Sequence, residues 1–280
     1  MTEWNAGRLL EVSGSYWQAC TLHAGVKLDI FSMIEAGNAG AEKIAEHLPS
    51  DVRGTAALLN ALAAMGLIEK TGEQYVNTPF SRNFLVKDSP QYIGYMVMHH
   101  HHLVEAWARL DQAVISGRPV RERRHPDPGE RESFLMGMFN MAMGIAPRLP
   151  GIIDLKGRGH LLDLGGGPGT YAIHFCLANP GLRATVADLP TSRPFAEKTI
   201  SRFGLSDRIA FVPCNYLQDD VPGTYDVAWL SHVLHGEGPD ECQMIINKTV
   251  STLSPGGVML IHDFILNDTC LLYTSDAADE

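Results

Sequence analysis

A glycine-rich turn is the segment of this sequence whose residue types and spacing point most directly to chemistry. Residues 161–164 are Leu-Leu-Asp-Leu, and Gly165, Gly167 and Gly169 follow at every second position. Glycines are needed where a ligand lies against the backbone, because a Cβ atom would collide with it. Thr170 stands where the dinucleotide fingerprint G-x-G-x-x-G has its third glycine, and the G-K-[S/T] of a P-loop is absent. The turn therefore predicts a ligand without a pyrophosphate.

Polar residues follow the next two apolar runs. Asp188 ends the first of them, 21 residues after Gly167, where a carboxylate can accept hydrogen bonds from both ribose hydroxyls. Asn215 and Tyr216 end the second and could meet an adenine ring. Together with Asp163 before the glycines, these residues indicate a nucleoside site. A tight turn in some other Rossmann-like protein is the alternative.

Strand and helix patterns alternate from residue 160 onward. Strands are expected over 160–164, 183–188, 209–214, 226–231 and 258–264. Helices are expected near 169–178, 191–203 and 239–253. Such alternation predicts an α/β domain with a parallel sheet and helices on both faces.

The first 155 residues carry mainly helical patterns. Helices are expected over 22–34, 41–47, 52–65, 90–116 and 130–149. A strand pair at 67–70 and 74–77 predicts a β-hairpin directly after the third helix. Three helices and a hairpin form a winged-helix pattern. We therefore expect a winged-helix dimerisation and substrate domain over 1–155 and a Rossmann-like domain over 156–269.

Composition and charge narrow the function classes. The net charge of −10 disfavours binding to nucleic acid or to an anionic membrane. A winged-helix DNA-binding regulator is still the alternative from another class. Its recognition helix would be 52–65, where Arg53 is the one basic residue, whereas DNA contacts need several. Five cysteines without C-x-x-C spacing fit a cytoplasmic protein, and no signal peptide or membrane span is expected.

Several segments resemble one enzyme family. Residues 163–169, Asp-Leu-Gly-Gly-Gly-Pro-Gly, resemble motif I of class I methyltransferases. Residues 229–235, 239–242 and 253–257 are similar to those of plant caffeate-type and bacterial hydroxyneurosporene-type O-methyltransferases. The winged-helix region is also similar to theirs, and the resemblance covers about residues 12–267.

The resemblance implies transfer of a methyl group from S-adenosylmethionine to a hydroxyl oxygen, with S-adenosylhomocysteine as product. His235 matches the position of the general base, and Asp263 matches a carboxylate that orients it. A phenol with a pKa near 10 needs such a base at neutral pH, and histidine is well suited to take the proton. The cofactor site would use Asp163, Gly165, Gly167, Asp188, Asn215, Tyr216 and Ser231.

The same resemblance implies a small-molecule acceptor and a homodimer. Phe134 and Met138 match positions that line the family's substrate site, and Met141 follows one turn later on the same helix. Plain core packing is the alternative for these three. No metal site is expected, because consecutive histidines at 99–102 point around a helix rather than to one face.

Two departures from the family pattern bear on the reaction. Gly236 follows His235 where the family usually has Asp, and Asn215 replaces an Asp on the adenine side. Some relatives use the bound cofactor in decarboxylation or hydroxylation, so non-methylating chemistry is the runner-up. Residues 270–280 do not continue the family and resemble a translated sequencing adapter, as in broken metagenomic gene models. We therefore expect a truncated chain with an incomplete sheet.

Overall fold

The computed structural model describes residues 4–120 and 128–264 of the 280-residue chain. The chain divides into two compact units between His102 and Leu103. Helices that the sequence placed in the front domain, up to residue 155, therefore belong to the same unit as the sheet. Among the described residues, no helix has the length and apolar character needed to cross a membrane. The tail expected to be artefactual, 270–280, lies outside the described residues.

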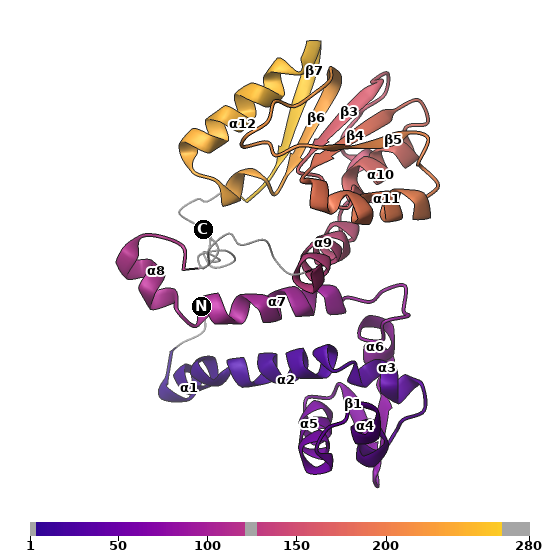
Figure 1. Ribbon diagram of the computed structural model, residues 1–280, viewed down its shortest axis with the longest axis vertical. Helices are drawn as coiled ribbons and strands as arrows, with labels where there is room; N and C mark the ends of the chain where they lie inside the picture. The colour runs from indigo at the N-terminus through magenta and orange to yellow at the C-terminus, as the bar shows by residue number, and fades with distance from the viewer. Residues whose placement is uncertain (1–3, 121–127, 265–280) are drawn as a thin grey trace. The chain divides into compact units, whose positions relative to one another are not determined.

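The first unit is mainly helical (Figure 1). Its elements are α1 (Ala6–Gly14), α2 (Tyr16–Lys27), α3 (Ile30–Glu35), α4 (Ala41–His47), α5 (Val52–Ala64), β1 (Ile68–Thr71), β2 (Gln74–Asn77) and α6 (Pro79–Phe84). Helix α7 (Gly94–Trp107) spans the point of division. Asp51 begins α5 by accepting a hydrogen bond from Gly54 N at 2.7 Å, as an N-cap should.

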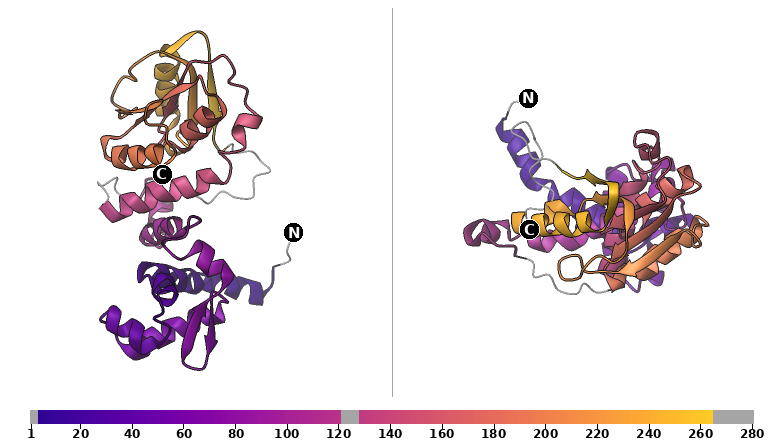
Figure 2. Two further views of the ribbon diagram at one scale, coloured as in Figure 1. Left: turned by 90° about the vertical axis from the view of Figure 1, so that its right-hand side faces the viewer. Right: turned by 90° about the horizontal axis from the view of Figure 1, so that it is seen from above.

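The winged-helix pattern predicted from the sequence is present as α3, α4, α5 and the hairpin. Strands β1 and β2 pair antiparallel (Figure 2, left), and a bridge between Gly40 and Gln74 ties the hairpin to the start of α4. The buried core of this unit includes Phe31, Leu59 and Tyr75. The winged helix is therefore a packed unit with its own core.

Two long helices expected in this region are broken. The one expected over 22–34 is interrupted at Asp29, whose φ of 56° is left-handed and whose carboxylate pairs with Lys87 Nζ at 3.0 Å. The one expected over 90–116 ends at Trp107, and α8 (Leu110–Ser116) is separate. Continuous apolar spacing did not reveal these breaks, because no Gly or Pro marks them.

The histidine run at 99–102 lies within α7. His101 Nε2 is 3.0 Å from Lys27 Nζ, and the ring of His101 packs edge-on against His23 at 5.6 Å. Burial, together with the neighbouring His101 and His100, lowers the pKa of His23 below its ordinary value. Packing against α2 is therefore a role of this run.

The second unit is built on a five-stranded parallel sheet in the order β5-β4-β3-β6-β7. Its strands are β3 (His160–Leu164), β4 (Arg183–Asp188), β5 (Ile209–Pro213), β6 (Tyr225–Ser231) and β7 (Leu253–His262). Its remaining helices are α9 (Pro128–Met143), α10 (Thr170–Ala178), α11 (Arg193–Arg202) and α12 (Pro239–Ser251). Short 3-10 turns are η1 (Leu149–Gly151), η2 (Pro190–Ser192) and η3 (Leu234–Gly236).

Each face of the sheet has its own core. Alternate strand residues point to opposite faces. Leu161, Trp229 and Ile200 of α11 belong to one cluster, and Leu162 and Ile245 of α12 belong to the other. Helices α10 and α11 thus cover one face and α12 the other (Figures 1 and 2). The predicted α/β class is confirmed.

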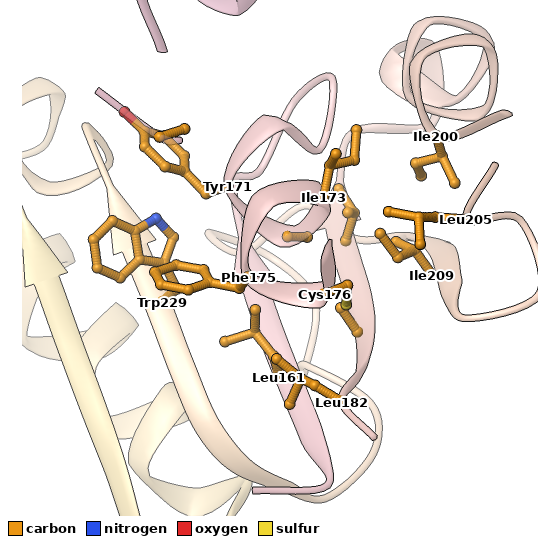
Figure 3. Packing of buried hydrophobic residues seen from close by; sticks show 14 of the residues in the cluster. Leu161, Tyr171, Ile173, Phe175, Cys176, Leu182, Ile200, Leu205, Ile209 and Trp229 are labelled. Carbon is orange, nitrogen blue, oxygen red and sulfur yellow. The ribbon is translucent and has the colours of Figure 1, made fainter. Parts of the chain in front are cut away.

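Aromatic packing under α10 fixes this helix against the sheet. The rings of Phe175 and Trp229 meet edge to face at 5.2 Å, and Tyr171 lies 5.4 Å from Trp229 (Figure 3). Burial of a side chain such as Phe175 contributes about 1.5–3 kcal/mol to the stability of the folded chain. Because α10 begins directly after the glycine-rich turn, this packing also positions the turn.

Candidate active site

The glycine-rich turn joins the end of β3 to α10 in a conformation that only glycine adopts without strain. Gly165 and Gly167 have φ values of 67° and 50°, in the left-handed region. A Cβ atom on Gly165 would lie 2.8 Å from Val233 Cγ2, which is closer than real contacts allow. Val233 therefore requires a glycine at this position, and the approach of a ligand to the turn stays a prediction.

Asp163 lies beneath this turn, in the core rather than at its surface. Its side chain is buried, Oδ2 accepts a hydrogen bond from Ala172 N at 3.2 Å, and Oδ1 has no hydrogen-bond partner in the structure. Burial raises the pKa of Asp163 to about 7. A buried oxygen without a partner is expected to find a donor in a water or a ligand. Asp163 therefore fits a site whose ligand carries N–H groups.

Asp188 ends β4 beside the turn. Its Oδ2 accepts from Gly167 N at 2.8 Å, and Oδ1 accepts from Leu189 N and Ser192 Oγ, both at 2.7 Å. Burial raises the pKa of this carboxyl group, while the hydrogen bonds from Ser192 and Gly167 act in the opposite direction. A carboxylate offers about four acceptor positions, so room for a further donor is left.

The two residues after β5 differ in how they are held. Asn215 Oδ1 accepts from Leu217 N at 3.1 Å, so its side chain closes the local turn. Tyr216 donates its hydroxyl to Glu237 Oε1 at 3.4 Å. A Cβ atom on Gly165 would lie 3.6 Å from Tyr216 Cε1, which places the tyrosine ring next to the glycine-rich turn. Tyr216 is thus better placed than Asn215 to contact a ligand at the glycine-rich turn.

Ser231 ends β6 and belongs to a packed polar group. Its Oγ lies 2.8 Å from His262 Nδ1, at the end of the neighbouring β7. The His262 ring stacks on Trp229 with an interplanar angle of 18°. The sequence did not single out His262, because the strand expected over 258–264 placed this residue within it, whereas β7 ends there.

His235 and Asp263 form the pair that the resemblance implied. His235 lies in η3 after β6, Asp263 directly follows β7, and His235 Nδ1 is 2.8 Å from Asp263 Oδ1. Asp263 also accepts from Leu234 N and Phe264 N, each at 2.9 Å. Burial acts to raise the pKa of Asp263, but these hydrogen bonds and His235 outweigh it, so the pKa lies below its ordinary value.

This pairing determines what His235 can do. An ionised Asp263 accepts from Nδ1–H, which makes Nε2 the nitrogen that can accept a proton. The His235 side chain is 24% exposed and that of Asp263 is 8% exposed. A reactant can therefore reach the histidine while the carboxylate behind it is shielded. The tautomer follows from this hydrogen bond.

The three predicted substrate residues lie along α9. Phe134 and Met141 are exposed, and Met138 is half-buried, whereas Leu135 and Phe139 on the same helix are in the core. A Cβ atom on Gly167 would lie 3.5 Å from Leu135, so α9 packs next to the glycine-rich turn.

Arg131, on the same helix, was missed by the sequence reasoning. It donates to Thr191 Oγ1, just after Asp188. No motif marked this arginine, because only the packing of α9 brings it near the end of β4.

Comparison with known proteins decides the family. Residues 10–87 match the O-methyltransferase dimerisation domain, and residues 101–272 match the O-methyltransferase domain. The chain belongs to the O-methyltransferase family. The enzymes of this family depend on S-adenosylmethionine. The narrower caffeate-type or hydroxyneurosporene-type assignment stays a prediction.

Curated relatives match along most of their length. A 3-hydroxy-5-methyl-1-naphthoate 3-O-methyltransferase of Streptomyces sahachiroi is 31% identical over 93% of this chain and 77% of its own. The tetracenomycin polyketide synthesis 8-O-methyl transferase TcmO of Streptomyces glaucescens is 29% identical over 94% of this chain and 79% of its own. The O-methyltransferase family thus includes enzymes that act on small aromatic and polyketide molecules.

Solved structures confirm the arrangement of elements. An O-methyltransferase family protein from Burkholderia thailandensis superposes with a TM-score of 0.82 at 28% identity, over 95% of this chain and 82% of its own. PigF with S-adenosylhomocysteine superposes with a TM-score of 0.85 at 25% identity, over 92% of this chain and 81% of its own. The O-methyltransferase fold predicted from motif I is therefore confirmed.

Proposed function

We propose that this enzyme methylates a hydroxyl group of a small aromatic or polyketide-type molecule, with His235 as the general base. The observation that carries the proposal is the 2.8 Å pair between His235 and Asp263. This pair lies at the carboxyl edge of the parallel sheet, as do Asp188 and the glycine-rich turn. Ligands of open α/β sheets bind at this edge.

S-adenosylmethionine, when bound, supplies an electrophilic methyl group on a sulfonium. We assign Asp188 to the ribose and the bare backbone of Gly165 and Gly167 to the closest approach of the cofactor. The partnerless oxygen of Asp163 fits a ligand with N–H donors. Tyr216 offers an apolar ring next to the turn, and the assignment extends to Asn215 and Ser231 on the same edge.

The role of His235 is to hold a proton at Nε2. A phenol hydroxyl has a pKa near 10, and only its deprotonated form is a strong nucleophile. His235 removes this proton as the oxygen attacks, and the ionised Asp263 stabilises the resulting imidazolium through Nδ1. General-base assistance of this kind contributes about 10²–10⁴ in rate.

Helix α9 supplies the proposed acceptor contacts. Phe134, Met138 and Met141 place one aromatic and two flexible apolar side chains outside the core, which suits a flat aromatic acceptor. Apart from His235, we assign substrate contact to the region before residue 155, and we assign cofactor binding to 156–269. The cysteines among the described residues are free thiols, which supports a place in the cytoplasm.

The test is transfer of an isotopically labelled methyl group from S-adenosylmethionine to a panel of acceptors. The panel contains hydroxynaphthoates, their O-methylated forms and aminonaphthoates as matched controls. We expect label in a methyl ether formed only from the free hydroxyl. Label on nitrogen or carbon would contradict the proposal, a relevant outcome because one relative, OxyT of Streptomyces rimosus, is an N,N-dimethyltransferase.

We also propose a homodimer formed through α1 and α2. Leu10 and Trp17 are 72% and 67% exposed, although both are large and apolar. Apolar surface of this kind marks an interface, and both residues lie within the matched dimerisation domain.

Replacing Leu10 and Trp17 with Glu is expected to convert the dimer to a monomer. Light scattering coupled to size-exclusion chromatography measures the mass. The matched control is Ile115→Glu in α8, because Ile115 is 84% exposed but lies outside the dimerisation domain. A double variant that keeps the dimer mass would contradict this interface.

A further inference from the structure

A second histidine lies beside the proposed base. His232, His235 and Asp263 each offer one ligand atom, and these atoms all lie within 4.8 Å of one another. The three residues come from the segment after β6, from η3 and from the segment after β7. They form a group at the carboxyl edge of the sheet, where no metal site was expected from the sequence.

His232 is held in an unusual backbone conformation. Its φ is 55°, in the left-handed region that few non-glycine residues adopt. Its backbone N donates to His262 O at 3.0 Å, which anchors the residue to the end of β7. Such conformations gather at functional sites. Methyl transfer as proposed above uses His235 and Asp263 but not His232, so that chemistry does not explain the position of His232.

We propose that His232, His235 and Asp263 form a binding site for a late divalent transition-metal ion, with Zn²⁺ as the best match. Two imidazoles and a carboxylate form a common ligand set for such ions and leave a coordination position open. Zinc bonds of about 2.0–2.1 Å place tetrahedral ligand atoms about 3.3 Å apart. Side-chain rotations that close the group by about 1.5 Å at most would suffice.

The surroundings prepare this group for a metal. Asp263 is held by backbone N–H groups of Leu234 and Phe264, each at 2.9 Å, so its carboxylate is oriented before a metal arrives. The Phe264 ring lies 5.0 Å from the His232 ring and 5.4 Å from the His235 ring, and provides an apolar cover on one side. Hard ions such as Mg²⁺ prefer all-oxygen sites and fit less well.

Metal binding would switch the enzyme off. A metal on His235 occupies the nitrogen lone pair that the proposed base needs, and it competes for Asp263. Reversible inhibition by Zn²⁺ therefore follows. This consequence rests on the proposed function of His235, whereas metal binding itself does not.

The test is equilibrium dialysis of the full chain against Zn²⁺, compared with His232→Asn. Asparagine tolerates the left-handed backbone but removes the imidazole. The matched control is His262→Gln, since His262 lies 5.0 Å from His232 but outside the ligand group. We expect one more tightly bound ion in the wild type and the control than in His232→Asn, with affinity at that site reduced about tenfold or more.

The histidine run at 99–102 can add weak sites, so the difference between variants is the quantity that decides. Equal Zn²⁺ binding by wild type and His232→Asn, or loss in His262→Gln instead, would overturn the assignment. The absorption of bound Co²⁺ gives a second readout, because tetrahedral coordination raises its visible intensity in the wild type but not in His232→Asn. A chain that binds Zn²⁺ but transfers no methyl group even when it is free of metal would refute the proposed function and leave the metal site standing.

Discussion

Replacement of His235 by Ala is expected to lower kcat for methyl transfer by about 10²–10⁴. The loss follows because the acceptor hydroxyl must then give its proton to water, while Asp263 is left without the imidazole that it orients at 2.8 Å. Affinity for S-adenosylhomocysteine should stay within about twofold of the wild type, since His235 is assigned to the acceptor. Kinetics with a phenolic acceptor and calorimetry measure the two quantities.

The matched control for this variant is His160→Gln. His160 begins β3 at the opposite edge of the sheet and pairs with Thr185 Oγ1 at 2.9 Å. The His160→Gln enzyme should keep the wild-type kcat. A His235→Ala enzyme with an unchanged kcat would show that another group takes the proton. Loss of cofactor binding together with activity would show instead that His235 maintains the structure of the site. Persistent cofactor turnover without methylated product would favour the non-methylating chemistry that Gly236 leaves open.

Replacement of Asp188 by Ala is expected to weaken the binding of S-adenosylhomocysteine by about 10- to 100-fold. A hydrogen bond to a charged group contributes about 1.5–3 kcal/mol, and each 1.4 kcal/mol is a factor of ten in affinity. The same substitution removes the acceptor of Gly167 N, so the glycine-rich turn loses a restraint at the same time. Calorimetric titration of both proteins measures the difference.

Two controls separate the ribose contact from effects on stability. Asp226→Ala removes a carboxylate that accepts from Gly159 N and His160 N at the opposite edge, so it should lower stability but not cofactor affinity. A cofactor analogue without the ribose 2′ hydroxyl should bind the wild type more weakly than the natural compound does. The analogue should bind Asp188→Ala with the same affinity as the natural compound does. An equal loss of affinity for the analogue in both proteins would show that the 2′ hydroxyl does not contact Asp188.

The alternation of strands and helices made the second unit predictable. Buried parallel strands read as short apolar runs, and the expected ends of β3 and β4 agree with the structure. Strand β7 begins at Leu253, earlier than expected. The start was missed because the first residues of the strand include Pro and Gly, which local propensity assigns to a turn. The strand also ends earlier than expected, at His262, so Asp263 lies directly after it instead of within it.

The candidate site was predictable only in part. Asp188 and the glycines follow from local spacing, because strand, turn and helix are adjacent in the chain. The contacts of Asp163, with one oxygen on Ala172 N and one without a partner, depend on burial beneath the turn. Arg131 could not be assigned from the sequence, since α9 packing brings it to the site from a distant segment. His232 lies only three residues before His235, but its place in a three-residue group depends on the β6–β7 pairing that brings Asp263 to the same edge of the sheet.

The most direct test of this account is a calorimetric titration of the full chain with S-adenosylhomocysteine, after circular dichroism shows that the protein is folded. We predict saturable binding at one site per chain, with an affinity that is weakened in Asp188→Ala and unchanged in Asp226→Ala. A folded chain that gives no binding heat at several temperatures, and no protection from thermal unfolding by the ligand, would contradict the assignment of the glycine-rich turn and Asp188 to the cofactor.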